Sequence, residues 1–272
     1  MSSDPPIITK SKLISDLKSL GLTTSETVMI HVSAKATGWI VGGPDVIIHA
    51  ILDVLGPSGT LMMYIKSEDP TDDFEYWPED RRQAYLDECP PFDPQRSRAY
   101  RKWSILTEYV RTWPGAHCSN HPEARIAAIG AKAQWITETH PLKYGYGQNS
   151  PLAKLCEARG KVLLLGAPLT TLTILHHAEH IAEVPNKRIE RFKYPMLISG
   201  EKQWIEIEQF DTSEGIVDWQ DGDYFLKIVE DYLKQERHKT GKAGAADSYL
   251  FDAKNLTDFA VSWMEKNFRE LP

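Results

Sequence analysis

The chain has 272 residues, of which 42% are hydrophobic and 25% charged, with a formal net charge of −7 and a pI near 5.7. Such a composition is typical of a packed globular protein, and its acidity argues against the basic face of a nucleic-acid binder. Three cysteines without a CxxC spacing argue against a disulfide framework. Because we find no signal-peptide pattern and no apolar run approaching the roughly 18 residues of a membrane span, we expect a cytoplasmic protein without a membrane partner.

The first part of the chain alternates helix and strand. Apolar residues at helical spacing predict a helix over residues 11–20, and Gly21 follows as its stop signal. The next predicted elements are a strand over 27–32, a helix from Pro44 to Gly56 and a strand over 60–65. This order indicates a layered α/β domain with mainly parallel pairing.

Residues 67–100 interrupt this alternation. The segment is rich in acidic residues, aromatic residues and prolines. Long ordered insertions are often binding loops or lids, and acidic groups among aromatic walls suit a polycationic, sugar-like ligand. We therefore treat residues 1–272 as a single domain in which 67–100 is a substrate-binding insertion; a solvated acidic loop is the alternative.

The alternation then resumes. The predicted helices are 104–112, two near Ala131 and Pro151, 223–235 and 252–268. The predicted strands are 125–129, 161–165, 248–251 and a hairpin of 193–198 with 203–208 that turns at 199–202.

The run His176-His177-Ala178-Glu179-His180 permits two incompatible interpretations. A helix beginning near Thr171 would place His176, Glu179, His180 and Glu183 along one face. As H-x-x-E-H, the run matches a zinc-protease motif with two histidine ligands and a glutamate base. The sequence shows no obvious third ligand, so a zinc-dependent hydrolase is the secondary hypothesis and we expect no metal.

The other interpretation makes one histidine a general base for acyl transfer to an amine. An imidazole is suited to taking a proton from the amine near neutral pH, and a carboxylate would orient the ring. The candidate carboxylates, which could instead bind a cationic acceptor, are Glu179, Glu183, Asp211 and Glu214.

Two weaker signals remain open. Cys118 lies between His117 and His121 and could carry an acyl group covalently. The glycine-containing loop 38–43 precedes a predicted helix and could hold a pyrophosphate, although it lacks the fingerprint of a nucleotide-binding loop.

Taken together, the segments resemble the aminoglycoside 3-N-acetyltransferases of the antibiotic N-acetyltransferase family. The resemblance runs through nearly the whole chain in order. It is carried by HVSAKATG (31–38), GPSGT (56–60), PPFDP (90–94), SNHPEA (119–124), NSP (149–151), LLLGAPL (163–169), LHHAE (175–179), PNKR (185–188) and SYLFDA (248–253).

The resemblance implies a three-layer α/β/α fold with a central, mostly parallel mixed sheet, and acetyl-CoA as the donor. The acceptor would be the 3-amino group of a 2-deoxystreptamine aminoglycoside, a reaction that confers antibiotic resistance. The family's base falls on His176. The implied coenzyme A contacts are Ser33, Lys35, Val41, Gly42, Gly43, Ser119, Thr171 and Thr173. The candidate aminoglycoside contacts are Tyr64, Asp69, Asp73, Glu123, Glu179 and Glu183.

These observations lead to one leading hypothesis, a direct acetyl transfer. His176 removes a proton from the attacking amine, and Asp211 or Glu214 is the preferred carboxylate to orient its ring. Backbone N–H groups near Thr171 to Thr173 would stabilise the oxyanion.

Overall fold

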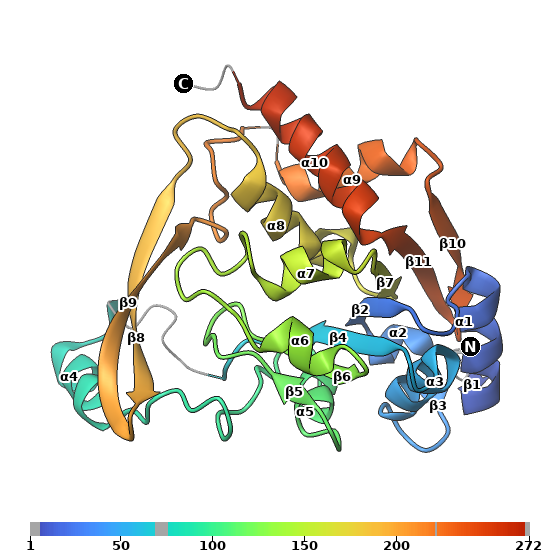
Figure 1. Ribbon diagram of the computed structural model, residues 1–272, viewed down its shortest axis with the longest axis horizontal. Helices are drawn as coiled ribbons and strands as arrows, with labels where there is room; N and C mark the ends of the chain where they lie inside the picture. Colours follow the sequence, from blue (N-terminus) through green and yellow to red (C-terminus); the bar gives the residue numbers. More distant parts are fainter. Residues whose placement is uncertain (1–5, 69–75, 221, 270–272) are drawn as a thin grey trace, which may run out of the picture.

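A seven-stranded mixed sheet forms the centre of the molecule in the computed structural model, which describes residues 6–68, 76–220 and 222–269 (Figure 1). The strand order is β10-β11-β7-β2-β4-β6-β5. Its strands are β2 (Thr27–Val32), β4 (Thr60–Tyr64), β5 (His117–Cys118), β6 (Ile126–Gly130), β7 (Lys161–Leu165), β10 (His238–Ala243) and β11 (Ala246–Asp252). The three central strands β7, β2 and β4 pair in parallel, whereas the flanking strands pair antiparallel.

Helices cover both faces of this sheet. One face packs against α1 (Lys10–Leu20), α3 (Val46–Leu55) and α5 (Leu106–Arg111). The other face packs against α6 (Ala133–Thr137), α7 (Pro151–Glu157), α8 (Ile174–Ile181), α9 (Tyr224–Leu233) and α10 (Ala253–Asn267). The three-layer α/β/α fold is therefore confirmed, with its parallel pairing confined to the central strands.

Strand alternation assigns each central side chain to one of the two layers. On β2, Val28, Ile30 and Val32 pack in the α1/α3 layer, while Met29 packs in the α8 layer. Successive side chains of a strand point to opposite faces, so His31 shares its face with Met29. The same alternation places Tyr64 on the face of Met62, which also packs in the α8 layer. His31 and Tyr64 thus reach the α8 side at the carboxyl ends of their strands.

Two smaller strand pairs lie outside the central sheet. β1 (Ile7–Ile8) and β3 (Trp39–Ile40) pair in parallel next to the short helix α2 (Ala34–Thr37). β8 (Ile189–Ile198) and β9 (Glu201–Phe210) form a long hairpin that turns at Ser199 and Gly200. The predicted hairpin is confirmed, but the turn is two residues long, because pairing continues to Ile198 and Glu201.

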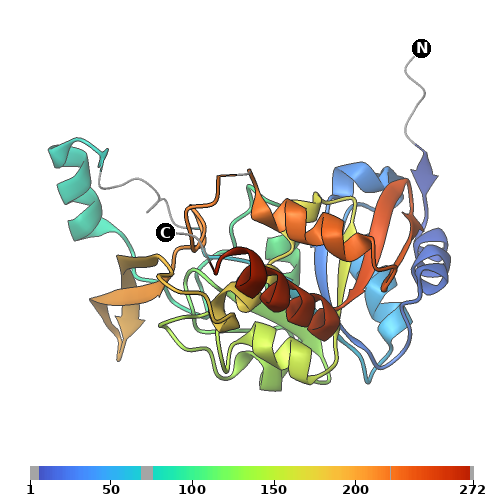
Figure 2. The same cartoon turned by 90° about the horizontal axis from the view of Figure 1, so that it is seen from above.

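The described part of the acidic insertion packs against this hairpin. Its helix α4 (Glu79–Glu88) and the hairpin project together from one end of the molecule in both views (Figures 1 and 2). The Lys202 ammonium group donates to the carbonyl oxygens of Leu86, Asp87 and Cys89 at 2.9–3.0 Å. Phe92, further along the insertion, packs with hairpin side chains in a small separate core.

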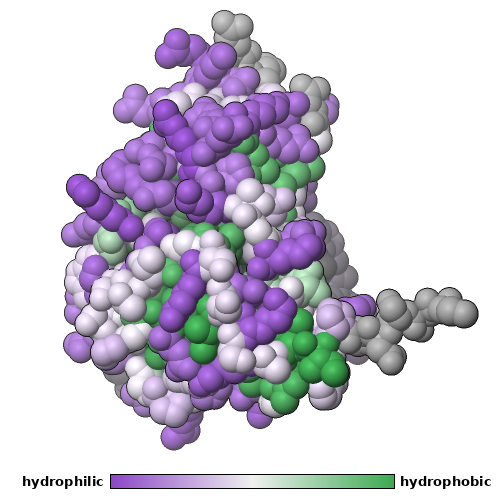
Figure 3. Space-filling model, turned by 90° about the vertical axis from the view of Figure 1, so that its right-hand side faces the viewer, coloured by the Kyte–Doolittle hydropathy of each residue, from purple (hydrophilic) through white to green (hydrophobic). Residues whose placement is uncertain are grey.

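The side that carries α1, β1 and β3 exposes hydrophobic side chains among hydrophilic ones (Figure 3). Ile7, Trp39 and Val41 belong to this group. Within the ranges that the structure describes, no helix has the length and apolar character needed to cross a membrane.

Candidate active site

The histidine run lies on α8, which is shorter than the sequence predicts. Thr171 belongs to a separate 3-10 turn, Leu169–Thr171, and α8 begins only at Ile174. The helix ends at Ile181, so Glu183 does not share a helical face with His176. Glu183 is exposed, and its backbone N–H donates to Glu265 at 2.9 Å. The predicted place of Glu183 beside the base is therefore wrong.

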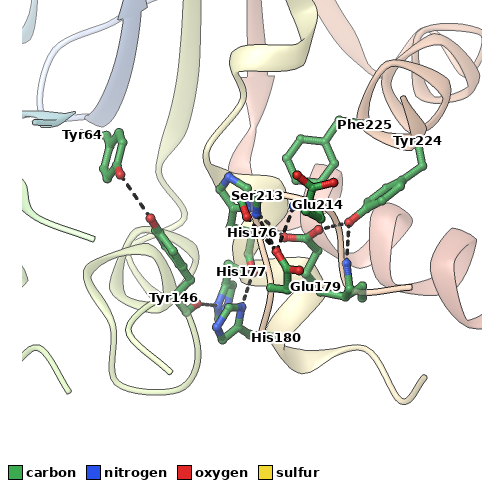
Figure 4. A network of polar contacts seen from close by, with 12 residues as sticks. Tyr64, Tyr146, His176, His177, Glu179, His180, Ser213, Glu214, Tyr224 and Phe225 are labelled. Carbon is green, nitrogen blue, oxygen red and sulfur yellow. Dashed lines mark hydrogen bonds and ion pairs between the residues drawn. The ribbon is translucent and has the colours of Figure 1, made fainter. Parts of the chain in front are cut away.

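His176 is held by a chain of hydrogen bonds that leads back to the main chain (Figure 4). Its Nδ1 atom lies 2.7 Å from Oε2 of Glu179, a carboxylate that is 1% exposed. The other carboxylate oxygen of Glu179 accepts a hydrogen bond from the Tyr224 hydroxyl. That hydroxyl in turn accepts from the backbone N–H of Ile216 at 3.2 Å. Nδ1 is thereby committed to Glu179, which leaves Nε2 for chemistry.

Burial and the nearby Glu179 carboxylate keep Tyr224 a donor. Desolvation is the main cause that raises the pKa of the Tyr224 hydroxyl, and the negative charge of Glu179 raises it further. The phenol therefore stays protonated at neutral pH. No local sequence pattern points to Tyr224, because it lies 45 residues from Glu179 and on a different helix.

The two neighbouring histidines hold the helix in place. The Nδ1–H of His177 donates to the Tyr146 carbonyl at 2.7 Å, and the Nδ1–H of His180 donates to the His176 carbonyl at 2.8 Å. Burial lowers the pKa of His180 to about 3. Within residues 6–68, 76–220 and 222–269, no group of three histidine, cysteine or acidic side chains could hold a metal ion. The zinc interpretation of His176 and His180 therefore lacks a ligand set in this part of the chain.

One cavity opens at the carboxyl ends of the parallel strands, where α/β proteins commonly bind ligands. Its volume is about 310 Å³, and its wall includes His31, Tyr64, Trp103, Thr173 and His176. The Tyr64 and Trp103 rings stack with centroids 5.4 Å apart. This wall combines flat apolar surface with a few hydroxyl and imidazole groups.

A second cavity, of about 340 Å³, opens on the other side of the same histidine. His176, Glu179, Glu214 and Asp223 contribute to its wall. The imidazole of His176 itself lies between the rings of Tyr146 and Phe225, at centroid distances of 5.1 and 4.9 Å. Thr170 and His176 contact both cavities, so the histidine stands where the two spaces meet.

Asp211 and Glu214 were the preferred partners of the His176 ring, and the structure corrects this preference. One oxygen of Asp211 accepts from the backbone N–H groups of Ser213 and Glu214 and from the Ser213 hydroxyl, at 2.9–3.0 Å. Asp211 thus fixes the loop in which Glu214 lines the second cavity. Glu179 occupies the orienting position instead, and each oxygen of its buried carboxylate is already hydrogen-bonded within the protein.

The loop expected to contact coenzyme A lies beside the strand-end cavity. Ser33 caps α2 by accepting from the Ala36 N–H at 3.3 Å, and Lys35 is exposed on this helix. The chain after β7 passes directly under α2, since a Cβ at Gly166 would lie 2.6 Å from the Cβ of Ala36. Val41 is 45% exposed beside the turn of Gly42 and Gly43, whose φ values are 94° and 101°.

Two of the other expected donor contacts line this cavity and one does not. Thr171 and Thr173 contribute to the wall, but the N–H of Thr171 donates to the Pro168 carbonyl at 3.1 Å. The proposed oxyanion role of that N–H is therefore not available. Ser119 is fully buried, where its hydroxyl accepts from the Ile126 N–H and bonds to His140 Nδ1 at 2.8 Å. The assignment of Ser119 to coenzyme A was wrong, because this hydroxyl is sealed in the core.

The expected aminoglycoside contacts are dispersed. The Tyr64 hydroxyl donates to the Glu123 carbonyl at 2.9 Å and lies 3.2 Å from the Tyr146 hydroxyl. The Glu123 carboxylate pairs with Lys66 at 3.1 Å. Asp69 and Asp73 lie outside the described residues.

Cys118 is separate from this site. It lies on β5 and packs against the α1/α3 layer. Burial raises the pKa of its thiol, although the charges of Arg125 and Arg111 act in the opposite direction. The adjacent His121 points its Nδ1 at the backbone N–H groups of Glu123 and Ala124. The thiol and His121 therefore do not form a nucleophile and base.

Fold and site together define an α/β enzyme in which a carboxylate-held histidine stands between two cavities, an arrangement suited to joining two substrates beside a base. The profile of the aminoglycoside 3-N-acetyltransferase family matches residues 29–265. This chain belongs to that family.

Relatives are similar over nearly their full length. Aminoglycoside N(3)-acetyltransferase III of Pseudomonas aeruginosa is 44% identical over 96% of this chain and 94% of its own. Among solved structures, AAC-IIIb in a binary complex with CoASH is 45% identical, with a TM-score of 0.90 over 98% of this chain and 100% of its own. AAC-VIa bound to sisomicin, from a room-temperature neutron/X-ray structure, is 33% identical with a TM-score of 0.89 over 97% and 100%.

Proposed function

We propose that this protein transfers the acetyl group of acetyl-CoA to the 3-amino group of 2-deoxystreptamine aminoglycosides, with His176 as the general base. The observation that carries the proposal is the position of the His176–Glu179 pair at the junction of two cavities of different character. Family membership and relatives named for this reaction support the same activity. We place the reaction in the cytoplasm, and its consequence would be antibiotic resistance.

The strand-end cavity suits the donor. Its apolar rings and hydroxyl groups match a pantetheine arm, which is an extended chain with amide groups. Lys35 is exposed shortly after Val32, which lines this cavity, and we assign Lys35 and the Gly42–Gly43 turn to the phosphates and the nucleotide of coenzyme A. In this arrangement the thioester lies next to His176, at the inner end of the cavity.

The second cavity suits the acceptor. Aminoglycosides carry several ammonium groups, which acidic side chains attract and orient. Glu214 and Asp223 line this cavity, and Asp211 holds the loop that presents Glu214. We assign Glu214 and Asp211 to acceptor recognition on this basis. The insertion at 67–100, with Asp69 and Asp73, remains a proposed extension of the same pocket.

The reaction begins with proton removal. Nε2 of His176 takes a proton from the 3-amine as the nitrogen attacks the thioester carbonyl carbon, and the carbonyl π electrons move to the oxygen. Glu179 stabilises the imidazolium that forms, because its carboxylate accepts the Nδ1–H at 2.7 Å. Collapse of the tetrahedral intermediate expels the thiolate of coenzyme A, which takes the proton from Nε2. The hydrogen bond from Tyr224 holds the Glu179 carboxylate in position during the whole reaction.

The test is thiol release from acetyl-CoA with a panel of 2-deoxystreptamine aminoglycosides, followed by NMR assignment of the acetylated nitrogen. We expect release that is indifferent to EDTA and a product acetylated at N3. The matched control is the same antibiotic already acetylated at the 3-amine, which should give no release. Acetylation at another nitrogen, no release with any acceptor, or an activity abolished by EDTA would each overturn the proposal.

A further inference from the structure

A second histidine faces the donor cavity. His31 ends the buried run of β2, and strand alternation turns it toward the α8 layer, away from Ile30 and Val32. The side chain is 9% exposed and contributes to the wall of the cavity that His176 also lines. The two imidazoles are close enough for the charge of one to act on the other.

The imidazole of His31 is unused by the fold. Its Nε2 atom is buried and has no hydrogen-bond partner among the described residues. Buried polar groups in folded proteins nearly always have a partner, and exceptions call for a specific explanation. The Nε2 atom of His180 is also buried without a partner, but His180, like His177, gives its Nδ1–H to a backbone carbonyl.

His31 is also kept neutral. Burial, and next the positive charge that His176 can carry, lower the pKa of His31 to about 4. A neutral imidazole carries one N–H and cannot compete with His176 for the proton of the amine. It can therefore serve the reaction only as a hydrogen-bond donor or acceptor.

The wall of this cavity offers several hydrogen-bonding groups, among them Thr173 and the His31 imidazole. Acyl transfer builds negative charge on the thioester oxygen, and fixed donors lower the barrier by stabilising that charge. Of the backbone N–H groups from Thr171 to Thr173 that the sequence suggests for this role, that of Thr171 is bonded to the Pro168 carbonyl. We infer that the neutral imidazole of His31 donates its N–H to the carbonyl oxygen of the donor thioester and stabilises the oxyanion. No proton is transferred from His31, because the proton that moves passes from the amine to His176 and then to the thiolate.

This inference rests on the proposed function, and its test separates the two. The variants are His31→Leu, which removes the donor, and His31→Gln, which keeps an N–H donor in a similar volume. Loss of one oxyanion donor lowers kcat by about 10²- to 10³-fold. We expect this loss for His31→Leu and recovery of at least about tenfold for His31→Gln, which restores a donor. Binding of coenzyme A, measured by calorimetry, and the melting temperature should remain close to those of the parent.

A spectroscopic readout distinguishes a donor from a packing residue. The probe is an acetyl-CoA analogue in which a methylene replaces the sulfur, with a ¹³C-labelled ketone carbonyl observed by infrared difference spectroscopy in the binary complex. We expect a lower carbonyl stretching frequency in the parent protein than in His31→Leu. Equal frequencies, or a kcat of His31→Leu within threefold of the parent, would overturn the inference.

Two further arms keep the test decisive. If His31→Leu does not fold, the parent labelled with ¹⁵N-histidine is used, and the inference fails if the His31 ring nitrogens do not shift when the ketone analogue binds. If the parent binds the analogue but acetylates no aminoglycoside, the proposed acceptor is wrong, while the carbonyl frequency still decides the role of His31.

Discussion

Replacing Glu179 with glutamine removes the charge opposite His176 and changes little else. The side chain is 1% exposed, and the substitution preserves its volume. The contact between Nδ1 and Oε2 is 2.7 Å, but the charges of an imidazolium and a carboxylate are delocalised, so their centres lie about 4 Å apart. At an effective dielectric constant of about 20, this pair contributes about 4 kcal/mol to stabilising the imidazolium.

About 4 kcal/mol corresponds to roughly a thousandfold in rate, because each 1.36 kcal/mol is tenfold. We therefore expect Glu179→Gln to lower kcat by about 10³-fold, since the imidazolium forms only as the amine is deprotonated. The KM for the aminoglycoside should change little. Initial rates of thiol release at saturating acetyl-CoA measure both quantities. A kcat within tenfold of the parent, in a variant with the parent's melting temperature, would refute the assignment of Glu179.

Three further predictions concern the surroundings of this pair. Tyr224→Phe leaves one oxygen of the buried Glu179 carboxylate without its hydrogen-bond donor. We expect kcat to fall by about tenfold and the free energy of unfolding, measured by urea denaturation, to fall by about 1–3 kcal/mol. An unchanged kcat would contradict the positioning role of Tyr224. Cys118→Ser should retain full activity and sequential rather than ping-pong kinetics, whereas loss of activity would restore the covalent route. Burial lowers the pKa of His140 to about 4 in the folded protein, whereas in the unfolded chain His140 takes up a proton near pH 6.5. The contribution of His140 to stability is therefore complete above pH 6.5 and is lost as the pH falls toward 4. The melting temperature should fall between pH 7 and pH 5, and His140→Gln should reduce that fall.

The central strands could be predicted from the sequence because each is a continuous apolar run. The strands over 27–32 and 161–165 were predicted with the bounds that the structure has, since both are buried on two faces. β10 was missed because its sequence, HKTGKA, is polar and largely exposed. The helix α4 was missed for a related reason, as it buries none of its residues and so lacks an apolar stripe.

The general base, His176, could be predicted from the sequence, but the groups that orient its ring could be predicted only in part. Glu179 was among the candidate carboxylates at a spacing of three residues from His176, which is the spacing of the contact that forms. Asp211 and Glu214 were preferred instead, and no local pattern indicates that Asp211 is consumed by its own turn. Tyr224 was beyond reach because its contact depends on how α9 packs near α8.

His31 shows what strand alternation can add once the layers are known. The sequence alone does not tell which face of a doubly covered strand meets the active site, because both faces are apolar. With α8 placed on one side, strand alternation along β2 turns His31 toward the α8 layer, whereas Val32 packs in the α1/α3 layer.

The central claim is that His176 is the base, and the most direct measurement is the single-turnover rate of acetyl transfer by His176→Gln. His49→Gln is the matched control, because His49 is exposed on α3 in the opposite layer. With acetyl-CoA and aminoglycoside both saturating, we predict a rate lower by roughly 10²- to 10⁴-fold for His176→Gln and an unchanged rate for His49→Gln. A His176→Gln protein that transfers acetyl at a rate near that of the parent would contradict the account.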